Sequence, residues 1–170
     1  HWNINELPVR NAIYQQLYGM RAAVEEVLLQ TDSAKYSNTL FVKNELSVTP
    51  TAKIFGIEVH SGDLLVSRGG AEVSALISRG NDYPANFSHI ALIYVDDQSG
   101  VPYLIEAHIE KGVAIATVEE YEKDKKLRFM VLRVRADLPA MLLNNRLPQT
   151  AARFAFEYAG KKHIPYDFKM

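Results

Sequence analysis

Cysteine is absent from this chain of 170 residues. Without a thiol, these residues can form neither a disulfide nor a thiolate-ligated metal site, and they carry no thiol nucleophile. The chain also lacks an excess of charge of one sign. It has 19 basic and 20 acidic residues and a formal net charge of −1. A nucleic-acid-binding face needs clustered basic residues, so we expect no nucleic-acid partner.

Long apolar runs and repeats are missing as well. No stretch approaches the roughly 18 apolar residues of a membrane-spanning helix, so we expect no transmembrane segment. With 48% hydrophobic and 23% charged residues, the composition is ordinary for a globular protein. The length fits one domain, and we therefore expect a single domain over residues 1–170.

Hydrophobic spacing predicts most of the secondary structure. A helical period over residues 5–30 predicts an N-terminal helix, within a segment (1–33) that flanks a sheet. Helices are also predicted over residues 71–79 and 149–159; the second is apolar around most of its circumference and should be buried. Residues 118–126 are charged and should be solvated. Strands are predicted at residues 40–42, 64–66, 112–117 and 129–134, and the last, almost continuously apolar, should be central.

The chain is organised around residues 86–111, which read as two strands joined by the turn residues Asp96 to Gly100. Side chains alternate along a strand, so Glu106 shares its face with His108. A histidine at the start of one strand and a carboxylate on the next can act as a base and its orienting group. We predict that His89 and Glu106 form a hydrogen bond at one end of the sheet. A histidine that only bonds a backbone carbonyl is the structural alternative.

The other histidines allow a second interpretation. His89, Glu106 and His108 offer two imidazoles and one carboxylate, a ligand set of the hydrolytic zinc type. No tight spacing such as His-x-x-x-His supports this set, and we predict no metal and no cofactor. His60 and His163 lie in turn-like contexts and should be solvated.

Four segments occur in an order that resembles the YiiX/YebB-like branch of the NlpC/P60 superfamily, which are permuted papain-like cysteine hydrolases. The segments read GDLLVSRG (62–69), FSHIAL (87–92), LIEA (104–107) and PYD (165–167). The likeness covers residues 62–170, which we take as the catalytic core, whereas the N-terminal third has no such anchor. We expect an α+β fold in which a bent antiparallel sheet is partly closed as a barrel and flanked by helices.

The resemblance implies His89 as base, Glu106 as its orienting group, and a cysteine nucleophile that follows the PYD segment. Because the given residues stop at Met170, we expect this core to be incomplete and the cysteine to lie beyond that residue. It would open a helix whose N-terminus favours the thiolate. A protein that has lost its nucleophile, or that uses another residue such as Ser67 or Ser74, is the alternative.

Three further residues are assigned to substrate contacts: Arg68, Ser88 and Tyr166. The planar guanidinium of Arg68 could hold a substrate carboxylate, although such an arginine is more often a surface residue. The hydroxyl of Tyr166 could approach an oxyanion or cap the core.

The resemblance implies hydrolysis of amide bonds in cell-wall (peptidoglycan) peptides, with a small peptide or cell-wall fragment as the partner. It also implies the bacterial cell envelope, the periplasm or secretion. Because the chain starts at His1, we expect a leader to have been removed. A non-catalytic peptide- or lipid-binding module of the same fold is the alternative, and an acyltransferase or lipid amidase is the third. The sequence does not predict the oligomeric state.

Overall fold

The computed structural model describes residues 2–32, 45–80 and 86–167, and the chain divides into two compact units, His1–Leu40 and Phe41–Met170. The first unit contains helix α1 (Leu7–Gln30), as the apolar period predicts. Pro8 lies in its first turn, where a missing N–H leaves no bond unmade. In the three described ranges, no helix is long and apolar enough to cross a membrane. The strand predicted at residues 40–42 lies outside these ranges.

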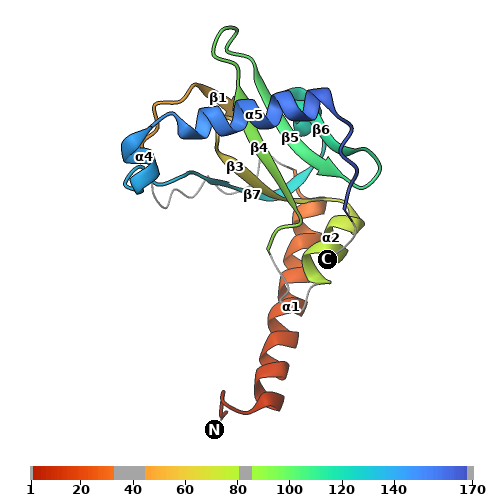
Figure 1. Ribbon diagram of the computed structural model, residues 1–170. Helices are drawn as coiled ribbons and strands as arrows, with labels where there is room; N and C mark the ends of the chain where they lie inside the picture. Colours follow the sequence, from red (N-terminus) through yellow and green to blue (C-terminus); the bar gives the residue numbers. More distant parts are fainter. Residues whose placement is uncertain (1, 33–44, 81–85, 168–170) are drawn as a thin grey trace. The chain divides into compact units, whose positions relative to one another are not determined.

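The second unit is built on an antiparallel sheet with the strand order β6-β5-β4-β3-β7 (Figure 1). Its strands are β3 (Leu64–Gly69), β4 (His89–Val95), β5 (Pro102–His108), β6 (Gly112–Thr117) and β7 (Lys126–Leu132). A separate hairpin pairs β1 (Thr51–Ile54) with β2 (Ile57–His60). The helices are α2 (Glu72–Arg79), α3 (Val118–Lys123), α4 (Pro139–Leu143) and α5 (Leu147–Lys161). The predicted α+β class is confirmed.

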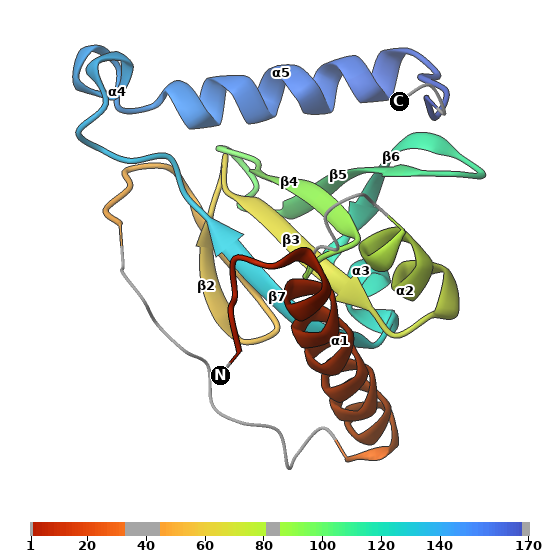
Figure 2. The ribbon, with the colours of Figure 1, turned by 90° about the horizontal axis from the view of Figure 1, so that it is seen from below.

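Alternation of side chains divides the core between the two faces of this sheet. One face packs Leu65, Ile93 and Leu104 against the β1–β2 hairpin and α3. The opposite face carries Tyr94 and Ile105, which pack beneath α5. Figure 2 shows α5 running across this second face of the sheet. Helix α5 covers this second face over β4, β5 and β6, whereas Leu64, Ile90 and Met130 on the same face are 36%, 53% and 41% exposed.

Strand β7 lies at the edge of the sheet, so the prediction of a central strand was wrong. Its apolar run has two different uses. Phe129 and Val131 pack against the core, whereas Met130 and Leu132 are 41% and 44% exposed. Apolar residues on both faces produced an unbroken run that is typical of a buried strand.

Helix α5 is a cover over the sheet and is buried along only one stripe. Ala152 is fully buried, and the Phe156 ring lies 4.7 Å from that of Tyr94. Phe154 and Tyr158, in contrast, are 70% and 44% exposed. The prediction of a helix buried around most of its circumference was therefore wrong, because the sheet covers one side of it only.

Two packing features were not expected from the sequence. Tyr121 of α3 is 3% exposed, although the segment around it is charged and was predicted to be solvated. The β1–β2 hairpin turns at Phe55 and Gly56, whose φ angles of 49° and 75° suit a tight hairpin turn. The Phe55-Gly56 pair, which lies between Ile54 and Ile57, was a signal for this hairpin.

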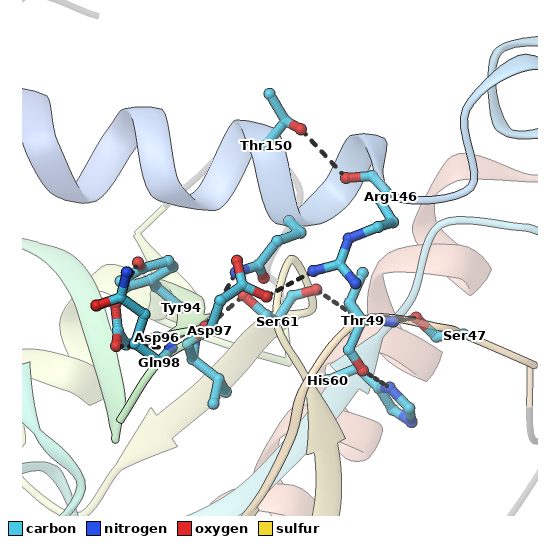
Figure 3. A network of polar contacts seen from close by, with 12 residues as sticks. Ser47, Thr49, His60, Ser61, Tyr94, Asp96, Asp97, Gln98, Arg146 and Thr150 are labelled. Atoms are coloured by element: carbon cyan, nitrogen blue, oxygen red, sulfur yellow. Dashed lines mark hydrogen bonds and ion pairs between the residues drawn. The ribbon is translucent and has the colours of Figure 1, made fainter. Parts of the chain in front are cut away.

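A polar network joins the hairpin to the sheet (Figure 3). Thr49 donates a 2.8 Å bond to the carbonyl of Ser61, whose hydroxyl accepts a 3.0 Å bond from the Val95 amide. His60 is 9% exposed, and its Nδ1 lies 3.0 Å from the Thr49 carbonyl oxygen. The prediction of a solvated His60 was therefore wrong, because this network encloses its ring.

Candidate active site

Strand pairing brings the predicted residues to one end of the sheet. His89 is the first residue of β4 and His108 the last of β5. Ala91 stands opposite Glu106 in this antiparallel pair, so His89 comes opposite His108 in the same register. Alternation then places all three side chains on the face that carries Ile93.

Glu106 bridges the two imidazoles, with one carboxylate oxygen for each. Its Oε2 lies 2.6 Å from Nε2 of His89, as the predicted hydrogen bond requires. Its Oε1 lies 2.8 Å from Nε2 of His108. The centroids of the two imidazole rings are 5.5 Å apart, and the ring planes are tilted by 36°. The sequence pattern predicted the first contact and placed His108 on the right face.

Burial differs sharply within this triad of His89, Glu106 and His108. The Glu106 side chain is 6% exposed, whereas those of His89 and His108 are 25% and 36% exposed. Burial alone would raise the pKa of Glu106, but hydrogen bonds and positive charge from both histidines bring its pKa below the ordinary value. The carboxylate is therefore ionised at neutral pH, and solvent reaches the imidazoles that it holds.

The bond to Glu106 determines which ring nitrogen of His89 is available for chemistry. When the ring is neutral, a proton on Nε2 faces the carboxylate, and Nδ1 is left as the proton acceptor. In the part of the chain that the structure describes, Nδ1 of His89 has no hydrogen-bond partner. The half-exposed ring can therefore take a proton from a group that approaches from solvent.

Three further residues lie around the triad: Ser67, which the sequence offered only as an alternative nucleophile, and Tyr121 and Lys126, which it did not assign. Ser67 stands opposite His89 across the β3–β4 pair, and its hydroxyl accepts a 2.9 Å bond from Tyr121. Burial raises the pKa of Tyr121, and the negative charge of Glu106 acts in the same direction. Ser67 is 1% exposed and bonded in this way, which makes it unsuitable as a replacement nucleophile.

Lys126 adds a buried positive charge on this side of the sheet. Its side chain is 9% exposed, and its ammonium lies 4.4 Å from the centroid of the Tyr121 ring. Burial lowers the pKa of Lys126, while the charges of Asp124 and Glu106 favour the protonated form. Lys126 belongs to a charged run, and only the packing of α3 and β7 distinguishes it from its solvated neighbours.

Two residues predicted to contact substrate, Arg68 and Ser88, also form hydrogen bonds with the backbone around them. Arg68 is 2% exposed, so the surface alternative for it was wrong, and its Nη1 donates to the carbonyls of Gly69 and Ala71. Ser88 is half-buried, and its amide donates a 2.9 Å bond to the carbonyl of Ser67.

The C-terminal segment returns to the same end of the sheet. The amide of Val113 donates a 2.9 Å bond to the carbonyl of Ile164, two residues before the half-buried Tyr166. The neighbouring Gly112 has a φ of 72°, and a Cβ there would lie 2.1 Å from the Ile164 oxygen. Gly112 stands opposite His108 in the β5–β6 register, which places this contact beside the triad. His163 is exposed, as predicted.

The triad can serve two kinds of chemistry. It can hold a histidine base against an ionised carboxylate, or it can present ligand atoms that all lie within 4.8 Å of one another to a metal ion. Comparison with protein-family models, with curated proteins and with solved structures finds no match for this chain. The likeness to the NlpC/P60 superfamily therefore stays a prediction that rests on four short segments.

Proposed function

We propose that this chain carries the base and the orienting carboxylate of a cysteine-type hydrolase of amide bonds. The observation that carries the proposal is the 2.6 Å bond between Nε2 of His89 and the buried carboxylate of Glu106. This bond holds the ring by Nε2 and leaves Nδ1 as the base. The thiol is not among these residues, and the proposal places it beyond Met170.

The proposed reaction uses one proton relay twice. Nδ1 of His89 takes the thiol proton, and the thiolate attacks the amide carbonyl to form a thioester. The imidazolium then gives its proton to the leaving amine. In the second half, the same nitrogen takes a proton from water, which attacks the thioester and returns the thiol. Ionised Glu106 stabilises the imidazolium in both halves, and backbone N–H groups would stabilise the oxyanion.

The position of the C-terminal segment is consistent with a cysteine nucleophile that follows it in the chain. The bond between Val113 and Ile164 holds Ile164 against β6, next to Gly112 and thus beside His108. In the resembled family the cysteine follows a Tyr-Asp segment such as Tyr166–Asp167, and the contact is consistent with that order.

Substrate and location follow from the resemblance alone. We propose cell-wall (peptidoglycan) peptides with γ-linked or D-amino acids as substrates, and the cell envelope, the periplasm or the medium of a bacterium as the place of action. An acyltransferase or lipid amidase would use the same relay on a different carbonyl. The partly exposed imidazoles are compatible with any of these carbonyl groups, since the site is open to solvent.

A non-catalytic module that binds peptides or lipid head groups is the second candidate. The absence of cysteine from these residues favours it, together with the burial of Ser67, the hydroxyl that stands opposite His89. In this function the triad would bind a ligand by hydrogen bonds and charge without any covalent step.

The test compares hydrolysis with binding. The protein is expressed with whatever residues its gene encodes after Met170 and incubated with peptidoglycan peptides, and new amines are detected by mass spectrometry. We expect cleavage, and a loss of about 10²- to 10⁴-fold in kcat/KM for His89→Ala, the usual contribution of a general base. His163→Gln, at an exposed histidine outside the triad, is the matched control. Binding without cleavage, or no cysteine after Met170, would favour the binding module.

A further inference from the structure

We propose that His89, Glu106 and His108 form a binding site for a divalent transition-metal ion such as Zn²⁺. Each side chain offers one ligand atom, and the three atoms all lie within 4.8 Å of one another. Two imidazoles and one carboxylate are a ligand set that zinc uses, with a further position left for water or substrate. The site does not depend on the proposed hydrolase.

The sheet fixes the three ligands without any long loop. His89 and His108 end neighbouring strands in register with each other, and Glu106 is two residues before His108 on the same face. Strand residues move little, so the distances between the three backbones are set before an ion arrives. This arrangement lowers the ordering cost that a site built from mobile segments must meet.

Binding requires only a small opening of the present hydrogen bonds. The Nε2 atoms now lie 2.6 and 2.8 Å from the carboxylate oxygens. Ligands that each lie about 2.0–2.2 Å from a tetrahedral zinc ion are separated by roughly 3.3–3.6 Å, so each ring must move away from the carboxylate by roughly 0.5–1 Å. Both rings are partly exposed and can make this movement. The Nε2 protons that now face Glu106 would be released when the ion binds.

Two features limit the expected affinity. Among the described residues, the Nδ1 atoms of His89 and His108 have no carboxylate or carbonyl partner to orient the rings, and such partners are worth about 10- to 100-fold in affinity. The buried ammonium of Lys126, which interacts electrostatically with Glu106, repels a cation. We therefore expect a dissociation constant in the micromolar range, weaker than that of a structural zinc site.

Metal binding and proton transfer exclude each other at this site. An ion on Nε2 of His89 removes the bond through which Glu106 orients the base, so the ion would inhibit the proposed hydrolase. This consequence rests on the proposed function, whereas the metal site itself stands on the geometry of the triad.

The direct test is a titration of the chelator-treated protein of residues 1–170 with Co²⁺ and with Zn²⁺. Isothermal calorimetry in two buffers of different ionisation enthalpy measures stoichiometry, affinity and protons released, and the visible absorption of Co²⁺ reports its coordination. We expect one ion per chain with proton release. His108→Ala and Glu106→Gln should each weaken binding by more than about 100-fold, because a ligand contributes more than the groups that orient it.

His163→Gln controls for adventitious binding by an exposed histidine, and circular dichroism confirms that each variant is folded. Binding that persists in His108→Ala and Glu106→Gln would overturn the site, as would a wild-type protein that binds neither ion. Zinc inhibition of hydrolysis, reversed by chelator, is a separate arm in the longer protein. If that protein does not hydrolyse amides, the titration still decides the metal site, so the two failures are distinguishable.

Discussion

Glu106 is the residue on which both chemical interpretations of the site depend. It is a buried carboxylate whose two oxygens are each hydrogen-bonded by an imidazole, and among the described residues no lysine or arginine forms an ion pair with it. A buried charge that loses its partners is strongly destabilising, whereas an amide of the same shape preserves part of the bonding. Glu106→Gln therefore separates the charge of this residue from its packing.

The charge of Glu106 should make stability depend on pH in a defined window. The pKa of Glu106 in the folded protein lies below its ordinary value of 4.5, so this carboxylate contributes stability that is complete above that value. The contribution is lost as pH falls through the lowered folded-state pKa. We expect the difference in unfolding free energy between wild type and Glu106→Gln to shrink over the pH range below about 4.5. Urea unfolding measures it, and a difference that is constant over this range would contradict the expectation.

At the residue scale, the sequence predicted the bond between His89 and Glu106, because strand alternation and a short hairpin fix their faces. It did not predict that Tyr121 and Lys126 are buried beside them. Those two residues lie in a short charged segment, and their burial depends on how α3 and β7 pack onto a sheet whose order local pattern cannot give. The burial of Arg68 was not predicted for the same reason.

Among the elements, β6 connects the triad to the C-terminal segment. Gly112 begins β6 opposite His108, and the amide of the next residue, Val113, holds Ile164. A side chain at Gly112 would collide with the backbone of this segment, which is the reason that glycine is required there.

Gly112→Ala should therefore release the C-terminal segment from β6. Gly100→Ala is the matched control, because its φ of 70° resembles the 72° of Gly112 but no atom lies within 4 Å of the added Cβ. The positive φ alone should cost about 1–2 kcal/mol in each variant. We expect a larger loss in Gly112→Ala, together with faster hydrogen exchange at the Val113 amide. Equal unfolding free energies and equal exchange in the two variants would show that the contact is unimportant.

At the element scale, the two hairpin strands β4 and β5, the strand β6 and the helix α2 could be predicted, since each has a local turn or period of its own. The position of β7 and the one-sided burial of α5 could not. Both are apolar on more than one side, and only the neighbours that the fold supplies decide which side is covered. The β1–β2 hairpin was not predicted from the sequence, because each of its strands has only 4 residues.

At the scale of the whole second unit, polar contacts tie the end of the sheet distant from the triad to its covering elements. Asp63, at 1% exposure, accepts bonds of 2.9 and 2.8 Å from Arg133 and a 2.8 Å bond from the His60 amide. On the opposite face, Gln149 in the first turn of α5 donates a hydrogen bond to the carbonyl of Val95 at the end of β4. These contacts hold the hairpin and α5 on opposite faces of one sheet.

Asp63→Ala should test how much this network contributes to the unfolding free energy. It leaves the largely buried guanidinium of Arg133 without its carboxylate, and breaking a buried pair in this way costs about 3–5 kcal/mol. Glu157→Ala removes an exposed partner of Lys161 on α5 and should change the unfolding free energy by no more than about 0.5 kcal/mol. Urea unfolding of the two variants measures both effects. A loss in Asp63→Ala as small as that in the control would show that the network does not stabilise the unit.

The α+β class of the molecule was predictable, because short turns join consecutive strands, which must then pair antiparallel, and the helical segments lie outside these hairpins. Closure into a partial barrel and the permuted papain-like arrangement stay predictions. They depend on strand curvature and on residues that could complete the site, which neither hydrophobic period nor turn chemistry specifies. The candidate site was predictable to the extent that it lies within one hairpin.

The most direct test of the central claim measures whether His89 activates a thiol. In the protein extended through the cysteine proposed after Met170, the rate of iodoacetamide alkylation is measured against pH. The account predicts thiolate formation well below the pKa of about 8.5 of a free cysteine, and a return toward that value in His89→Ala. His163→Gln should retain the wild-type profile. The same profile with and without His89, or a gene that encodes no cysteine there, would contradict the account.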